Sequence, residues 1–143
     1  MYECMGLGPS GMDKARELLS KDAFAKHNGI ELVEIEPGTA KAVMTVGKEH
    51  FNGVGIVHGA AIFSLADFAF AAASNSHGVV AVAINANISF VKAATSGTLT
   101  AEAKEKSINP KLATYLIDVT DDEGDLVATF QGMVYRKKPR PSE

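Results

Sequence analysis

Hydrophobic residues along the chain follow two periods, one typical of helices and one typical of strands. Between residues 11 and 26 apolar side chains recur every three or four positions and charged side chains fill the other face, which predicts one amphipathic helix. Strand-like patterns occupy 30–35, 40–46, 79–91, 98–107, 112–120 and 125–136. Because short turn sequences separate most of these stretches, we expect a mostly antiparallel sheet.

The stretch from residue 60 to 76 is apolar on every side of a helix, with an acid, Asp67, at its centre. A helix of this kind is surrounded by other structure, and this one is too short to span a bilayer. The order of elements predicts an α+β domain in which a curled antiparallel sheet wraps around this central helix. Since one sheet cannot cover every side, a second subunit is expected against its small residues, which are Ala60, Ala61, Ala66, Ala69 and Ala73.

The strand predicted at 79–91 has the cleanest alternation in the chain. If the alternation is unbroken, one face carries its large apolar residues and the other its small or polar ones. The predicted apolar face consists of Val80, Val82, Ile84, Ala86, Ile88 and Phe90. The opposite face carries Asn85, Asn87 and Ser89 among others, and is free to meet water, a partner or a ligand.

The composition of the 143 residues fits one globular domain, with 46% hydrophobic residues and a formal net charge of -3. We predict a flexible N-terminal arm at 1–10, a single domain at 11–138 and a C-terminal tail at 139–143. The charge gives no overall drive toward nucleic acid. Cys4 is the single cysteine and no secretory or membrane signal is present, so a cytoplasmic protein that binds no membrane is expected.

Asp67 is the chemical anomaly of the sequence, because an unpaired carboxylate is costly to bury. Burial would raise its pKa, whereas a helix dipole or a hydrogen bond would lower it, and the sequence leaves the balance open. A carboxylate in such a place can serve as a general base. The alternative is a structural ion pair at a subunit contact.

Around this acid, several residues follow a characteristic spacing, namely Asn52, Val57-His58-Gly59, Phe63 and Leu65-Ala66-Asp67. This spacing resembles that of the hotdog-fold acyl-CoA thioesterases, in particular the phenylacetic acid degradation branch. The similarity runs from about residue 29 to 135. It implies that the backbone N–H of Gly59 binds the thioester carbonyl, that Asp67 activates water or attacks as a nucleophile, and that Asn52 positions the thioester or the water. It also implies an acyl-CoA substrate with no metal or redox cofactor.

The spacing of Gly59 and Asp67 adds a geometric prediction. An amide at a helix N-terminus can stabilise an oxyanion, but eight residues of helix separate the two groups by roughly 12 Å. One chain therefore cannot complete the site. Two antiparallel central helices across a two-fold axis would bring Gly59 of one chain to Asp67 of the other. We expect a homodimer with shared sites, and a homotetramer built from it.

Two positions depart from the family pattern, in which a second glycine commonly occupies position 60 and a threonine position 68. Ala60 suits a helix N-terminus, whereas Phe68 is large enough to narrow the acyl pocket. The acyl group is expected to lie between subunits near Phe63, Phe68 and Phe70. On the following strand, Asn85 is a candidate to orient water where relatives have a hydroxyl residue near Ala83.

Several assignments have plainer alternatives. Asn52 can simply shape the Asn-Gly turn, and His58 can order the entry to the helix and line the substrate site instead of acting as a base. If His58 and Asp67 formed an acid–base pair, the protein would be an enoyl-thioester hydratase or dehydratase. If Asp67 only maintained the dimer, it would be a non-catalytic acyl-CoA-binding module.

Other candidate chemistry is weaker. His27, His50 and His77 lack ligand-like spacing, so no metal site is expected and surface or capping roles are predicted. Exposed lysines at 104, 106 and 111 and the basic cluster at 136–140 can bind coenzyme A phosphates or remain solvated charge. The sequence does not decide between these two roles.

Overall fold

The computed structural model describes residues 10–138. The helical elements are α1 (Gly11–Ser20), α2 (Ala23–His27), the short 3-10 turn η2 (Lys48–His50) and α3 (Gly59–Asn75). The strands are β1 (Ile30–Glu36), β2 (Thr39–Thr45), β3 (Ala81–Phe90), β4 (Thr98–Ile108), β5 (Leu112–Thr120) and β6 (Leu126–Arg136). No helix within these residues is long and apolar enough to cross a membrane.

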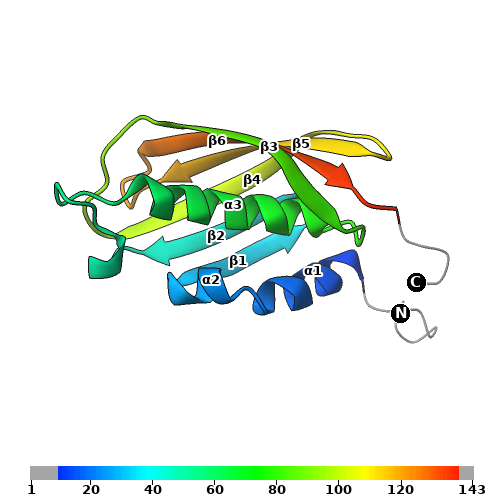
Figure 1. Cartoon of the computed structure of the whole chain (residues 1–143), viewed down its shortest axis with the longest axis horizontal. Helices are drawn as coiled ribbons and strands as arrows, with labels where there is room; N and C mark the ends of the chain where they lie inside the picture. Colours follow the sequence, from blue (N-terminus) through cyan, green and yellow to red (C-terminus); the bar gives the residue numbers. More distant parts are fainter. Residues whose placement is uncertain (1–9, 139–143) are drawn as a thin grey trace.

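One sheet holds all six strands in the order β1-β2-β4-β5-β6-β3, and every neighbouring pair is antiparallel. Helix α3 runs across one face of this curved sheet, and α1 and α2 lie beside it near β1 (Figure 1). The core between α3 and the sheet includes Leu65, Leu99, Ile117 and Phe130, each at most 1% exposed. The architecture confirms the predicted α+β hotdog fold.

The single helix expected at 11–26 is wrong, because the chain leaves the helical path at Lys21 and Asp22. The Asp22 carboxylate accepts a hydrogen bond from the backbone N–H of Ala25 and begins α2. Aspartate side chains readily accept hydrogen bonds from free backbone amides at helix starts. At the other end, Ser10 caps α1 through the N–H of Asp13, so this one described residue of the expected arm is ordered. Residues 1–9 and 139–143 lie outside the described residues.

Helix α3 ends where the sequence predicts, with Gly78 at a φ of 81° shortly after it. Its exposure differs from the prediction in one respect. Three of the small residues expected to meet a partner, Ala66, Ala69 and Ala73, are fully buried against the chain's own core. The outward stripe of α3 instead consists of Ala60, Phe63, Ser64, Asp67 and Ala71.

The predicted faces of the strand at 79–91 are also wrong, because β3 contains a bulge. Its register on β6 shifts between Ala83 and Asn85, so Ile84 is an extra residue. One extra residue moves the rest of the strand to the opposite faces. Beyond the bulge Ile88 pairs with Phe130 on the core side, whereas Val82 before it pairs with the exposed Tyr135. The six apolar residues therefore do not share one face.

Candidate active site

Asn52 shapes the turn that leads into α3. Its side-chain oxygen accepts hydrogen bonds from the backbone N–H groups of Val54, at 3.0 Å, and Ile56, at 3.2 Å. Its backbone N–H donates to the carbonyl of Ile56 at 2.8 Å. The plainer role suggested by the sequence is therefore present. The side-chain NH₂ of Asn52 has no partner within residues 10–138 and remains available as a donor.

Gly59 is the first residue of α3, and His58 is its N-cap. The ring Nδ1 of His58 accepts from the N–H of Ala60 at 2.9 Å, and the His58 carbonyl accepts from the N–H of Ala61 at 3.0 Å. The N–H of Gly59 has no hydrogen-bond partner among the described residues. Because a helix N-terminus also carries partial positive charge, this amide is suited to bind a developing oxyanion.

A hollow of about 350 Å³ lies beside this amide, and we call it the Gly59 hollow. Its lining comes from the turn, from the start of α3 and from the end of β3, and includes Asn52, Gly59, Ile62, Phe90 and Lys92. Glycine matters here because a Cβ on residue 59 would lie 3.1 Å from Cζ of Phe90. A side chain at residue 59 would therefore crowd the ring of Phe90, which lines the same hollow as the amide.

Asp67 lies half-buried on the outward stripe of α3, in a second hollow of about 270 Å³ that we call the Asp67 hollow. Burial raises the pKa of its carboxyl group, and the nearby negative charge of Asp22 raises it further. No hydrogen bond or ion pair within residues 10–138 opposes this shift. A carboxylate with a raised pKa and no partner is a stronger base than an ordinary one.

The two hollows have no lining residue in common. Gly59 and Asp67 therefore face different spaces in one chain, as the separation of roughly 12 Å along the helix requires. His58 is exposed and does not line the Asp67 hollow. The acid–base pair that a hydratase would need is thus not formed within the chain.

The three phenylalanines expected at the acyl site separate in the structure. Phe63 and Phe68 line the Asp67 hollow. Phe70 is only 1% exposed and packs against Tyr115 and Phe130 on the sheet side of α3. It belongs to the core and not to either hollow.

Asn85 is also remote from both hollows. It pairs with Met133 on β6, whose neighbours Gly132 and Val134 are the residues that face the core. The Asn85 side chain therefore lies on the face of the sheet opposite α3, because the bulge changes the parity of the strand. Within this chain the structure does not bring it to Asp67 or Gly59.

His50 was expected to be a surface or capping residue; it is not at the surface, since it is 2% exposed, but it does have the capping role, because its ring caps the start of η2. Its Nδ1 accepts from the N–H of Gly47 and its Nε2 bonds with the carbonyl of Asn28, both at 2.9 Å. Its own carbonyl accepts from the N–H of His58 at 2.7 Å. His50 thus fixes the segment that precedes α3 and supports the position of Gly59.

Asp22 is a site residue that the sequence did not reveal. Its side chain caps α2 and also lines the Asp67 hollow. The available signal was an aspartate on the polar face of a helical pattern three residues before Ala25, which is a capping arrangement. Within residues 10–138 no group of three or more His, Cys, Asp or Glu side chains is placed to hold a metal ion.

Comparison with known proteins assigns the family. A family model described as the thioesterase superfamily matches residues 54–128. The chain belongs to the thioesterase superfamily. A relative from Archaeoglobus fulgidus is 50% identical over 106 residues, which cover 73% of this chain and 69% of that protein. The acyl-coenzyme A thioesterase PaaI of Escherichia coli is 37% identical over 85% of this chain and 88% of its own length.

Solved structures agree with this assignment. The structure of PaaI from the E. coli phenylacetic acid degradation operon matches with a TM-score of 0.86 and 36% identity, over 90% of this chain and 94% of that chain. A variant of PaaI from Thermus thermophilus matches with a TM-score of 0.78 and 34% identity, over 81% and 100% of the two chains. The predicted branch, fold and thioester hydrolase class are confirmed, whereas the roles of Asp67, Gly59 and Asn52 stay predictions.

Proposed function

We propose that this thioesterase hydrolyses an acyl or aryl-acyl coenzyme A thioester to the free acid and coenzyme A. The observation that carries the proposal is the pairing, on one helix, of an unoccupied N-terminal amide at Gly59 with a half-buried, unpartnered carboxylate at Asp67. The relative named acyl-coenzyme A thioesterase supports the coenzyme A ester as substrate. A cytoplasmic location stays a prediction that rests on the sequence.

In the proposed mechanism the Asp67 carboxylate takes a proton from a water molecule as its oxygen attacks the thioester carbon. The carbonyl oxygen becomes an oxyanion and accepts the N–H of Gly59. The side-chain NH₂ of Asn52 donates to the carbonyl or orients the water. The carbon–sulfur bond then breaks, the carbonyl reforms, and the coenzyme A thiolate leaves and is protonated. Attack by Asp67 itself as a nucleophile is the alternative use of the same group.

The active unit that we propose is a homodimer in which Gly59 of one chain and Asp67 of its partner complete each site. Two features support a partner on this side. The outward stripe of α3 exposes Asp67 beside apolar side chains. Among the described residues, edge strand β3 pairs only with β6. It exposes Val82 by 42% and Ile84 by 55%, and Val80 just before it is 54% exposed, which is unusual for a free edge. Assembly of dimers into a homotetramer stays a prediction.

The first test is a panel of acyl-CoAs assayed for free thiol. Asp67→Asn should lower kcat/KM by at least about 10²-fold, the usual effect of removing a general base. Asp118→Asn, which changes an exposed aspartate on β5, is the matched control and should leave turnover unchanged. A folded Asp67→Asn enzyme with full turnover would overturn the assignment. Enoyl hydration without thiol release would favour the hydratase, and tight binding without turnover the binding module.

Subunit mixing tests the shared site. A mixed dimer of one Asp67→Asn chain and one Gly59→Ala chain contains one site with both wild-type residues and one site with neither. Random mixing of the two inactive variants should therefore restore about a quarter of wild-type activity, since half of the dimers are mixed and each has one intact site. If each chain held its own complete site, every site would carry one substitution and mixing would restore nothing.

A further inference from the structure

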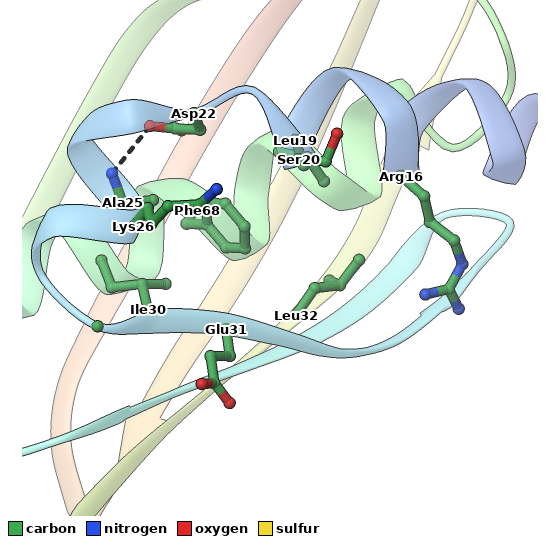
Figure 2. A pocket seen from close by; sticks show the side chains of 11 residues that line it. Arg16, Leu19, Ser20, Asp22, Ala25, Lys26, Ile30, Glu31, Leu32 and Phe68 are labelled. Atoms are coloured by element: carbon green, nitrogen blue, oxygen red, sulfur yellow. Dashed lines mark hydrogen bonds between the residues drawn. The ribbon is translucent and has the colours of Figure 1, made fainter.

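A larger hollow, which the proposed mechanism does not use, lies next to the Asp67 hollow. It has a volume of about 430 Å³, and we call it the tail hollow. Helices α1 and α2 form one side of it and β1 the other, with Phe68 of α3 between them (Figure 2). Ile30 and Leu32 point from β1 into this space, whereas Glu31 points away from it (Figure 2). Its apolar lining comes from Leu19, Ala25, Ile30, Leu32 and Phe68, and its polar lining from Arg16, Ser20, Asp22, Lys26 and Glu31.

The two hollows share part of their lining. Asp22, Ala25, Ile30 and Phe68 line both. Phe68 has the largest side chain of the four and directly follows Asp67 in α3. Its side chain is 6% exposed, so its ring is held in place between the two spaces. The ring therefore forms the main barrier between the carboxylate and the tail hollow.

We propose that Phe68 sets the upper limit of acyl length by closing the far end of the Asp67 hollow. The inference rests on the proposed function and names its substrate class. The wild-type enzyme acts on short aliphatic and single-ring acyl groups, which fit beside Asp67 without entering the tail hollow. Removal of the ring joins the two spaces and admits a longer linear chain. An apolar tail suits the part of the second space that Leu19, Ile30 and Leu32 line.

The size of the effect follows from the burial of methylene groups. Each methylene moved from water into an apolar space improves binding by about fourfold. In the wild type, methylenes beyond the limit stay in water and add nothing. In a variant with a smaller residue 68, each methylene that enters the tail hollow should raise kcat/KM by about that factor until the hollow is filled.

The test is the chain-length profile of Phe68→Leu on a series from butanoyl-CoA to dodecanoyl-CoA, assayed for free thiol. The wild type should reach a plateau or decline at short chains, and Phe68→Leu should extend the rise to longer ones. Phe70→Leu is the matched control, since it makes the same change on the same helix but lines neither hollow. Phe68→Met, whose unbranched side chain is smaller than phenylalanine and can bend aside, is the second variant if Phe68→Leu folds poorly.

A second-site substitution tests whether the gain comes from the tail hollow. Leu32 lines this hollow and not the Asp67 hollow. Adding Leu32→Trp to Phe68→Leu should refill the space and cancel the gain on long chains while short chains are hydrolysed as before. Val33→Trp, on the same strand and 48% exposed, should not cancel it.

The outcomes separate this inference from the proposed function. Three results would each overturn the role of Phe68. They are an unchanged chain-length profile in Phe68→Leu and Phe68→Met, a wild type that already prefers dodecanoyl-CoA, and a gain on long chains that persists with Leu32→Trp. In all three cases acyl-CoA hydrolysis itself stands. Failure of the wild type to release thiol from any acyl-CoA overturns the proposed function, and the inference with it.

Discussion

A methyl group on residue 59 tests the oxyanion contact without changing Asp67. In Gly59→Ala the added Cβ would lie 3.1 Å from Cζ of Phe90 and 3.5 Å from its Cε1 and Cε2 atoms. The ring is 52% exposed and can move by the few tenths of an ångström required. Alanine is also favoured over glycine in helices by about 0.5–1 kcal/mol. The free energy of unfolding should therefore change by less than about 1 kcal/mol.

The effect of Gly59→Ala on turnover should be much larger than its effect on stability. The methyl group would lie against the ring of Phe90 at the Gly59 hollow, next to the amide that the carbonyl oxygen must reach in the proposed mechanism. An oxyanion contact requires a donor at about 2.7–3.1 Å, and loss of one such donor lowers kcat by about 10²–10³-fold, or roughly 2.7–4 kcal/mol. Free-thiol kinetics on the best acyl-CoA, beside urea unfolding, measures both effects on one preparation.

Gly53→Ala is the control for this substitution. Gly53 lies in the same turn, its φ is not positive, and a Cβ added there meets no atom within 4 Å. It should leave both turnover and stability unchanged. Adding Phe90→Ala to Gly59→Ala removes the contact with the ring but not the block at the amide, so activity should stay low. Full turnover by a folded Gly59→Ala enzyme would refute the role of this amide.

Three further substitutions test the ionisable groups. Burial, and then the charge of Asp22, raise the pKa of Asp67 above its ordinary 3.8. Between these two pKa values the native state binds more protons than the unfolded state, so the free energy of unfolding of the wild type falls as pH rises. Asp67→Asn should therefore resist urea better at pH 7 but not below pH 3.8. Asp22→Asn keeps a capping side chain and should move the acid limb of the kcat/KM profile to lower pH; an unmoved limb would contradict the influence of Asp22. Burial raises the pKa of Glu105, but hydrogen bonds with His77 and Tyr115, both at 2.8 Å, outweigh it and leave this pKa below its ordinary 4.5. Tyr115→Phe should lower the unfolding free energy by about 1.5 kcal/mol at pH 7, and urea curves should show this loss shrinking as pH falls below 4.5 through the pKa of Glu105.

The elements that the sequence predicts well are those specified by local pattern. The apolar helix before Gly78 and the hairpins around 36–38 and 121–124 follow from period and turn residues alone. The break at Asp22 was missed because the sequence does not distinguish a carboxylate that caps a helix from an exposed acid within a helix. The bulge at Ile84 was missed because the alternation runs through it without interruption, although one extra residue changes the faces of the strand.

The candidate site is predictable where its signal lies in one segment and not where it depends on distant residues. Asp67 stands out because its neighbours are apolar. The contrast between Phe63 and Phe70 is not visible in a helix that is apolar all round. It depends on Gly132, where an added Cβ would lie 2.6 Å from Cζ of Phe70. That glycine lets Phe70 pack closely on the sheet, whereas Phe63 contacts the core at Phe130 and also lines the Asp67 hollow.

The exposure of α3 agrees with the geometry that a shared site demands. If residue 59 of one chain lies opposite residue 67 of an antiparallel copy, the two-fold axis passes midway between them, near Phe63. The partner then covers only the first half of the helix. Along α3, the residues with exposed or half-exposed side chains at 60, 63, 64 and 67 all lie in that half, whereas the stretch 68–75 is buried in its own chain except at Ala71. The chain's own core therefore leaves open the part of α3 that the proposed dimer requires, with Asp67 at its far end.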